Sequence, residues 1–165
     1  GIEYTVASLL IEAGMTAEGM AVVEDIHERY LSAGRYWNHI ECGGHYYRAM
    51  SSWSPMISYA GFRLNAPAEE IAFNPAVNAD PWACPFVTPG AWGVHTRSGG
   101  ETRIEVREGL LALSSCVLPY AAGAKRARVA LSGRDVPASV DADGRVSFGR
   151  QSIAAGDSLT IRTEV

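Results

Sequence analysis

This sequence has no long hydrophobic run and no excess of basic charge. None of its apolar stretches approaches the roughly 20 residues that a membrane-spanning helix needs. It carries 14 Lys and Arg against 18 Asp and Glu, which gives a formal net charge of −4. A protein that binds duplex DNA normally presents a basic face, so we expect no nucleic-acid partner, whereas contact with a membrane surface stays open. With 165 residues, 47% of them hydrophobic, the chain can bury a core in one domain or in two small ones.

Cysteine is also scarce. Cys42, Cys84 and Cys116 are an odd number at long spacings, which fits neither a disulfide framework nor a zinc site with closely paired ligands. Two histidines six residues apart, His39 and His45, are likewise no metal signature by themselves. We therefore interpret the three cysteines as buried thiols and predict no metal and no cofactor.

The first residues carry no recognisable targeting pattern. The sequence begins with Gly1 rather than Met, and no charged region or cleavage site precedes the first helical stretch. We therefore expect this start to be internal to a longer protein. The compartment is then undetermined, with a slight preference for the cytoplasm.

Helical periodicity fills the first third of the chain. Apolar residues recur at helical spacing over residues 2–14 and 16–34, each stretch ends in glycine, and Thr16 is a candidate N-cap for the second. The pattern predicts a third helix over residues 43–61, antiparallel to its neighbour and kinked or locally unwound by Pro55.

After residue 61 the pattern changes to short alternating or β-branched segments separated by Gly, Pro, Asn and Asp. The dipeptide Asp143–Gly144 between two such segments predicts a two-residue hairpin turn. The charges divide at the same point, because residues 1–61 hold three basic and seven acidic side chains and residues 62–165 hold eleven of each. We predict an α+β chain with a helical segment, 1–61, and an antiparallel β-rich region, 62–165. The clearest strand segments are Ile104–Val106, Leu110–Leu113, Arg128–Leu131 and Leu159–Arg162.

Chemistry-bearing side chains gather between residues 35 and 48. A sugar is recognised by planar hydrogen-bonding groups at its adjacent hydroxyls and by an aromatic ring against its C–H face. Glu41 and Arg48 supply groups of the first kind, and Trp37 or Tyr36 supplies the second. The segment is therefore a candidate sugar site, although Glu41 and Arg48 fit a structural ion pair equally well.

The run Asn38–Trp53 resembles a segment near the end of the catalytic domain in glycoside hydrolase family 116, the family of the non-lysosomal glucosylceramidase and bacterial β-glucosidases. The resemblance covers about residues 1–95 and is most specific in Glu41–Trp53. Flanking parts of it are Tyr4–Met20, Gly61–Leu64, Phe73–Pro75 and Trp92–Gly93.

This resemblance implies a retaining β-glycosidase whose catalytic domain is an (α/α)6 toroid. The chain would hold the last helices of that toroid, followed by the β-rich C-terminal part. Retaining hydrolysis uses two carboxylates about 5–5.5 Å apart, and in the family both come from segments before the matched one, so no catalytic residue is expected here. The implied partners are a carbohydrate or glycoside substrate and the rest of the chain's own catalytic domain.

The resemblance also implies a substrate-binding role for the segment. Arg48 matches a family arginine that binds sugar hydroxyls, with Glu41, His39, Asn38 and Trp37 close by. The family usually has a glutamate where this sequence has His39. A carboxylate accepts from two hydroxyls, whereas a neutral imidazole offers one donor and one acceptor. A changed sugar, a weakened enzyme and an indirect role for His39 are all open.

Two other functions fit the sequence. Residues 62–165 could form a non-catalytic carbohydrate-binding or packing module, although 13 of the 15 aromatic residues lie between Tyr4 and Trp92, which counts against sugar stacking beyond that point. The chain could also belong to an unrelated (α/α)6 carbohydrate-active enzyme of the glucoamylase or phosphorylase kind.

Overall fold

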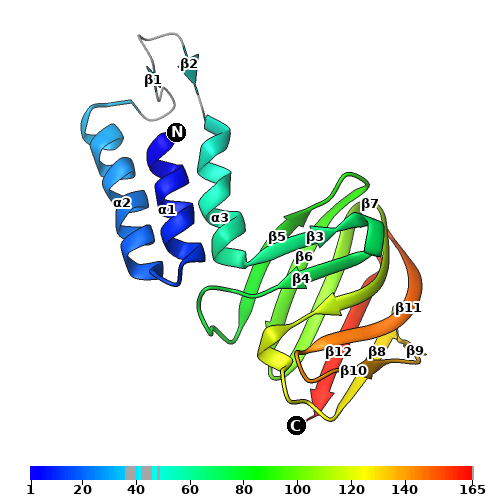
Figure 1. The fold of residues 1–165 in the computed structure, drawn as a ribbon. Helices are drawn as coiled ribbons and strands as arrows, with labels where there is room; N and C mark the ends of the chain where they lie inside the picture. The colour runs from blue at the N-terminus through cyan, green and yellow to red at the C-terminus, as the bar shows by residue number, and fades with distance from the viewer. Residues whose placement is uncertain (36–39, 42–45, 48, 165) are drawn as a thin grey trace. The chain divides into compact units, whose positions relative to one another are not determined.

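A computed structural model describes residues 1–35, 40–41, 46–47 and 49–164, and only the backbone of residues 40, 41, 46, 47 and 49. The chain divides into two compact units (Figure 1). The helical unit contains Gly1–Gly61 and Pro75–Val77, and the sandwich unit contains Phe62–Asn74 and Asn78–Val165. The predicted order of helices first and a mainly antiparallel sheet second is confirmed.

Three helices form the helical unit, and α1 lies between the other two (Figure 1). Their bounds are Ile2–Glu12 for α1, Thr16–Ser32 for α2 and Trp53–Ala60 for α3. Gly19 of α2 lets α1 approach closely, because a Cβ there would lie 2.7 Å from Ile11 Cγ1 and 2.8 Å from the Ala7 carbonyl oxygen. A larger residue at this position would separate the two helices.

Two side-chain contacts join α1 to α3. The hydroxyls of Ser8 and Ser54 lie 2.7 Å apart, and Ser58 donates to Glu12 Oε1 at 2.9 Å. The contact partners advance in the same direction along both helices, so α1 and α3 run parallel. Gly19 of α2 lies beside Ile11 of α1 and Arg29 of α2 pairs with Glu3, so α2 runs antiparallel to α1. The third helix is therefore antiparallel to α2, the helix before it, as the sequence predicted, and parallel to α1 (Figure 1).

The start of α3 also differs from the prediction. The backbone forms paired strands β1 (Ile40–Glu41) and β2 (Tyr46–Tyr47) and then a 3-10 turn, Ala49–Ser52, before α3 begins at Trp53. Pro55 thus lies in the first turn of the helix, where its missing N–H has no intrahelical partner to lose. A kink at Pro55 is consequently not needed.

The cap of α2 differs as well. Thr16 is the first helical residue, Met15 precedes it, and the helix has no side-chain cap. Its end agrees with the sequence pattern, because Gly34 has φ +68° just beyond the last turn.

The sandwich unit contains ten strands in two layers that share β7. Layer A has the order β5-β6-β7-β12-β8-β9, and layer B has the order β3-β4-β7-β11-β10. All neighbours are antiparallel except β4 and β7, which are parallel. The strand bounds are β3 Phe62–Asn65, β4 Glu70–Phe73, β5 Trp82–Val87, β6 Ala91–Ser98, β7 Glu101–Val117, β8 Arg126–Leu131, β9 Arg134–Val136, β10 Ser139–Val140, β11 Arg145–Ala154 and β12 Ser158–Glu164.

Strand β7 passes from one layer to the other at Gly109. Its first half pairs with β6 and β12, and its second half pairs with β4 and β11. Gly109 has φ +87°, and a Cβ there would lie 2.1 Å from the Gly90 carbonyl oxygen. Only glycine fits this bend. The sequence pattern found the two halves, near Ile104–Val106 and Leu110–Leu113, but not their union in one strand.

The core lies between the layers and is supplied by alternate residues of each strand. In β7, Ile104 and Val106 face inward, and Arg103 lies between two inward-facing positions with its side chain exposed. Phe73 from layer B stacks on His95 from layer A, with ring centroids 3.9 Å apart and an interplanar angle of 5°. This contact shows that the inner faces of the layers pack directly together.

The turn at Asp143–Gly144 joins β10 to β11, as the sequence predicted. It is longer than two residues, because Val140 pairs with Val146 and the amide of Asp141 donates to the Arg145 carbonyl at 3.1 Å. The Asp141 carboxylate accepts from the amides of Asp143 and Arg145 at 3.0 and 2.9 Å. The side chain of Asp141 thus stabilises a wider turn.

In the described part of the chain, no helix combines the length and the apolar character needed to cross a bilayer.

Candidate functional site

The sugar site predicted from the sequence falls largely outside the described residues. Trp37, Asn38, His39 and Arg48 lie outside them, and of Glu41 only the backbone is described, in β1 opposite Tyr46. Whether the five side chains converge stays a prediction. The backbone of β1 and β2 does place Ile40–Glu41 antiparallel to Tyr46–Tyr47, so the two ends of this segment lie side by side.

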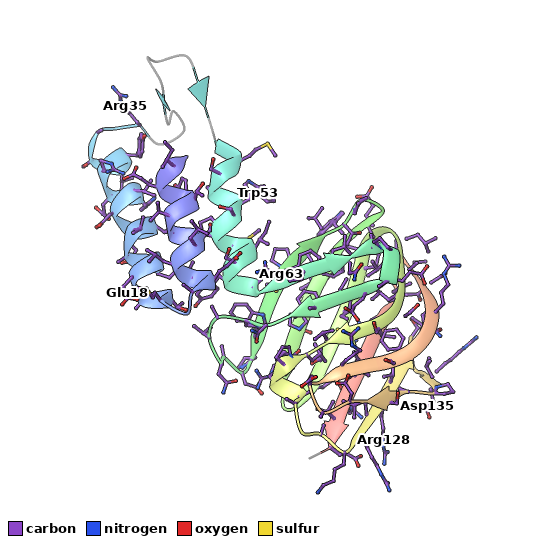
Figure 2. The ribbon with its side chains drawn as sticks, in the orientation of Figure 1. Glu18, Arg35, Trp53, Arg63, Arg128 and Asp135 are labelled. Carbon is purple, nitrogen blue, oxygen red and sulfur yellow. The ribbon has the colours of Figure 1, made fainter. Side chains whose placement is uncertain are left out.

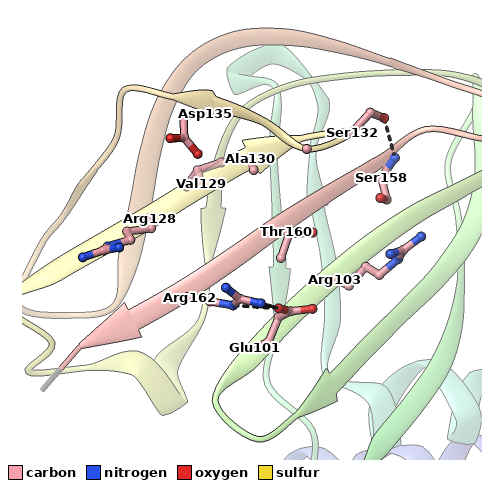
Figure 3. Close-up of a pocket in the computed structure, with 11 residues that line it drawn as sticks. Glu101, Arg103, Arg128, Val129, Ala130, Ser132, Asp135, Ser158, Thr160 and Arg162 are labelled. Atoms are coloured by element: carbon pink, nitrogen blue, oxygen red, sulfur yellow. Dashed lines mark hydrogen bonds and ion pairs between the residues drawn. The ribbon is translucent and has the colours of Figure 1, made fainter.

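An open pocket of about 640 Å³ lies on the outer face of layer A (Figure 3). Its floor follows one row of paired residues across four neighbouring strands, namely Arg103, Thr160, Ala130 and Asp135. These residues alternate with buried core residues such as Ile161, which is why their side chains point outward. Further lining residues are Glu101, Arg128, Val129, Ser132, Gly133, Ser158 and Arg162.

All three arginines of the pocket form ion pairs, at unequal distances. Arg162 donates to Glu101, with Nε 2.7 Å and Nη2 2.6 Å from Oε2. Arg128 Nε lies 3.2 Å from Glu164 Oε1. The guanidinium of Arg103 has a weaker link, with Nη2 3.6 Å from Glu105 Oε2. Arg103 therefore keeps most of its donors for other partners.

A second polar group is buried between the layers and is centred on His95, which has no exposed surface. Its Nε2 lies 3.3 Å from the Tyr120 hydroxyl, and its Nδ1 lies 3.6 Å from Cys84 Sγ. The Tyr120 hydroxyl also lies 2.9 Å from that of Thr102, and Arg97 covers the Tyr120 ring at 4.5 Å.

Burial controls the protonation of this group. Desolvation, with a smaller contribution from the positive charge of Arg97, lowers the pKa of His95 to about 4. Desolvation raises the pKa of the Cys84 thiol and strongly raises that of the Tyr120 hydroxyl. All three groups are therefore neutral at pH 7. With no exposed surface at the histidine, the group is suited to holding the layers together rather than to meeting a substrate.

The two cysteines whose side chains are described agree with the interpretation of the cysteines as buried thiols. Cys84 and Cys116 are buried free thiols, and burial raises the pKa of Cys116. Cys42 lies outside the described residues. Across the described ranges, no group of three or more His, Cys, Asp or Glu side chains could hold a metal ion.

The sequence analysis did not find the pocket on layer A. Its residues come from five parts of the chain, between Glu101 and Arg162, and only strand register brings them together. A usable signal did exist, because Arg103, Thr160 and Ala130 occupy outward positions in segments that alternate. Without the pairing partners, that pattern does not reveal a common row.

Comparisons with solved structures find glycoside hydrolase chains. A GH127 β-L-arabinofuranosidase from Geobacillus stearothermophilus T6 matches with a TM-score of 0.43 and 12% identity, over 70% of this chain and 18% of that one. A second GH127 β-arabinofuranosidase matches with a TM-score of 0.42 and 14% identity, over 69% and 21% of the chains. A chain described as a glycoside hydrolase matches with a TM-score of 0.45 and 14% identity, over 76% and 21%.

The present chain thus spans about a fifth of the length of these proteins. No family model matches the sequence, and no curated protein does. Two of these proteins belong to family 127 and the third is named only as a glycoside hydrolase, so the resemblance to family 116 rests on the sequence motif. What the comparisons give is a similarity in structure between this chain and part of several glycoside hydrolase chains.

Proposed function

We propose that this chain is the C-terminal part of a retaining β-glycosidase of the family 116 kind, which hydrolyses terminal β-linked sugars. The observation that carries the proposal is the run Glu41–Trp53, with its acidic residue, paired glycines, arginine and tryptophan. The chain's partners are then a glycoside substrate and the rest of its own catalytic domain.

The direction of the helices supports a place in an (α/α)6 toroid. Such a ring alternates inner and outer helices, so that consecutive inner helices run parallel and an outer helix returns between them. In this chain α1 and α3 are parallel neighbours through the Ser8–Ser54 and Glu12–Ser58 contacts, and α2 lies between them in sequence. We interpret α1 and α3 as two inner helices of the proposed ring and α2 as the outer helix that connects them.

Exposed apolar side chains on α1 and α3 support a larger helical domain. In α1, Ile2 and Leu9 are 66% and 62% exposed. In α3, Trp53 and Ile57 are 57% and 43% exposed, and Figure 2 shows Trp53 extending from the helix. Burying one such side chain contributes about 1.5–3 kcal/mol. Neighbouring helices of a toroid would cover these surfaces.

The chemistry assigned to the segment is sugar binding, and the two catalytic carboxylates come from elsewhere in the protein. Arg48 donates charge-assisted hydrogen bonds to sugar hydroxyls. Such bonds are about twice as strong as those from a neutral donor. Glu41 accepts from hydroxyls, and Trp37 supplies a flat apolar face. Asn38 and His39 complete the set, and His39 in place of a carboxylate alters which hydroxyls are preferred.

Substitution of Arg48 tests the proposal. In the intact protein, Arg48→Ala should lower kcat/KM for an aryl β-glycoside by about 100-fold, because charge-assisted bonds to the sugar are lost. The matched control is Arg29→Ala, which removes an exposed arginine of α2 outside this segment and should leave kcat/KM unchanged. Equal kinetics for both variants and the wild type would contradict the role of Arg48.

A further inference from the structure

The pocket on the outer face of layer A has a floor of small side chains. Thr160 of β12 pairs with Ala130 of β8 on one side and with Arg103 of β7 on the other, and Ala130 pairs with Asp135 of β9. Thr160 and Ala130 leave a hollow between the longer side chains at the two ends of the row (Figure 3). The hollow therefore follows from the sequence and the register of four strands.

The unused hydrogen-bonding groups lie along this row. Arg162 is held by two short contacts with Glu101, and Arg128 has one contact of 3.2 Å with Glu164, so both are engaged more closely than Arg103. By contrast, the one ion pair of Arg103 among the described residues is the 3.6 Å link to Glu105. Within the described part of the chain, the structure gives no side-chain hydrogen bond to the hydroxyl of Thr160 and none to the carboxylate of Asp135. The row thus offers a donor, a hydroxyl and an acceptor in order.

The pocket and its ion-pair partners carry no excess of positive charge. Arg103, Arg128 and Arg162 are offset by Glu101 and Asp135 in the lining and by Glu164 and Glu105, which pair with Arg128 and Arg103. A phosphate or other anion would meet the Asp135 carboxylate without an excess of positive charge to compensate. A neutral ligand whose groups both donate and accept hydrogen bonds suits this lining better, and sugar hydroxyls have that property.

The dimensions agree with an extended ligand. Neighbouring strands are about 4.8 Å apart, so Arg103 and Asp135, three strand spacings apart in the row, are separated at the backbone by roughly 14 Å. The volume of about 640 Å³ is that of an ordinary small-molecule site. None of the lining residues is aromatic, so recognition depends on hydrogen bonds and the affinity is modest.

We propose that this pocket is a second sugar-binding site, separate from the Arg48 segment, which holds a neutral oligosaccharide between Arg103, Thr160 and Asp135. The choice of ligand rests on the proposed function, since a glycosidase meets such chains as substrates or as parts of them. The site would keep a glycan on the protein while hydrolysis takes place elsewhere.

Two substitutions and a matched control test the site. Binding of neutral oligosaccharides of two to four residues, from the gluco, galacto, xylo and arabino series, is measured by calorimetry on the intact protein in an Arg48→Ala background. Arg103→Ala and Thr160→Val should each weaken binding at least 10-fold. Arg107→Ala is the control, because Arg107 is on the same strand and also pairs with Glu105, at 3.2 Å, but does not line the pocket. It should bind like the background protein.

The outcomes separate this site from the proposed function. If Thr160→Val weakens the binding at least 10-fold in the Arg48→Ala background, and as a single substitution leaves kcat/KM for a small aryl β-glycoside unchanged, the second site is supported. If no oligosaccharide binds, or if Arg107→Ala weakens binding as much as Arg103→Ala, the site is overturned, whereas hydrolysis by the protein would still support the glycosidase. Binding of inorganic phosphate that is lost in Arg103→Ala would also overturn it and would identify an anion site.

Discussion

The buried side chain of His95 makes the stability of the two-layered sandwich depend on pH. Its ring stacks on Phe73 across the core, and its two nitrogens face Cys84 and Tyr120. The nearby charge is that of Arg97, which adds to the cost of protonation. The neutral ring is therefore part of the core packing, and protonation would place a charge where no water can reach it.

Acid should destabilise the sandwich unit through His95. The folded pKa of about 4 lies below the ordinary value of 6.5, so between these values the unfolded chain binds a proton that the folded chain does not. Stability should then fall by about 3 kcal/mol as the pH drops from 7 to 4 and change little from this source below pH 4. Urea denaturation at a series of pH values measures this loss of stability, and hydrogen exchange of the amides in β7 follows it within the sandwich unit.

A pair of variants isolates the effect of this histidine. His95→Phe keeps an aromatic ring against Phe73 and should remove most of the pH dependence attributed to this position. His27→Gln, a change at an exposed histidine of α2, should leave it intact. If the pH dependence of β7 exchange is the same in both variants, the buried group is not its source.

At the scale of elements, β7 organises the sandwich because it belongs to both layers. Its bend at Gly109 depends on a positive φ and on a close approach to Gly90. The turn that precedes β7 contains Gly100, which also has a positive φ, of +80°, but a Cβ there would lie in open space. A comparison of alanine at Gly100 and at Gly109 therefore distinguishes the cost of the positive φ from the cost of the close contact.

Alanine at these two positions should have unequal effects. Gly100→Ala should cost about 1–2 kcal/mol, the usual penalty for a left-handed alanine. Gly109→Ala adds a contact of 2.1 Å with a backbone oxygen that cannot move away without breaking the strand, so it should cost about 3 kcal/mol or more. Chemical denaturation measures both values. Equal losses in the two variants would show that β7 does not need its tight bend.

Sequence patterns predicted the elements better than their boundaries. The glycines after α1 and α2 and the Asp143–Gly144 turn are local signals, because each fixes the backbone by its own residue type. The start of α3 and the length of β7 depend on pairing with distant strands or helices, and no local pattern contains that information. The pocket on layer A is the clearest case, since its row exists only after four strands have paired.

At the scale of the whole molecule, the exposed apolar surface of the helical unit needs a partner surface. The exposed side chains of α1 alone include Ile2, Val6 and Leu9, at 66%, 45% and 62%. A patch of this kind on one helix face is unusual for a stable monomer. In the proposed enzyme, other helices of the catalytic domain cover it.

The 165-residue chain made alone should therefore self-associate and bind a hydrophobic dye. Leu9→Lys should reduce both properties, because it places a charge in the apolar face of α1. Leu110→Lys alters a leucine of similar exposure, 57%, in the sandwich unit and should change neither. Light scattering and dye fluorescence provide the measurements. A monomeric chain with a sharp cooperative melt would contradict this account of the α1 surface.

The central claim is that the chain completes a retaining β-glycosidase, and the stereochemistry of hydrolysis tests it most directly. The intact protein is incubated with aryl β-glycosides of glucose, galactose, xylose and arabinose, and the first sugar released is observed by proton NMR. The account predicts release of at least one of these sugars with the β configuration retained. Release of the α anomer first, or no release from any of the four, would contradict it.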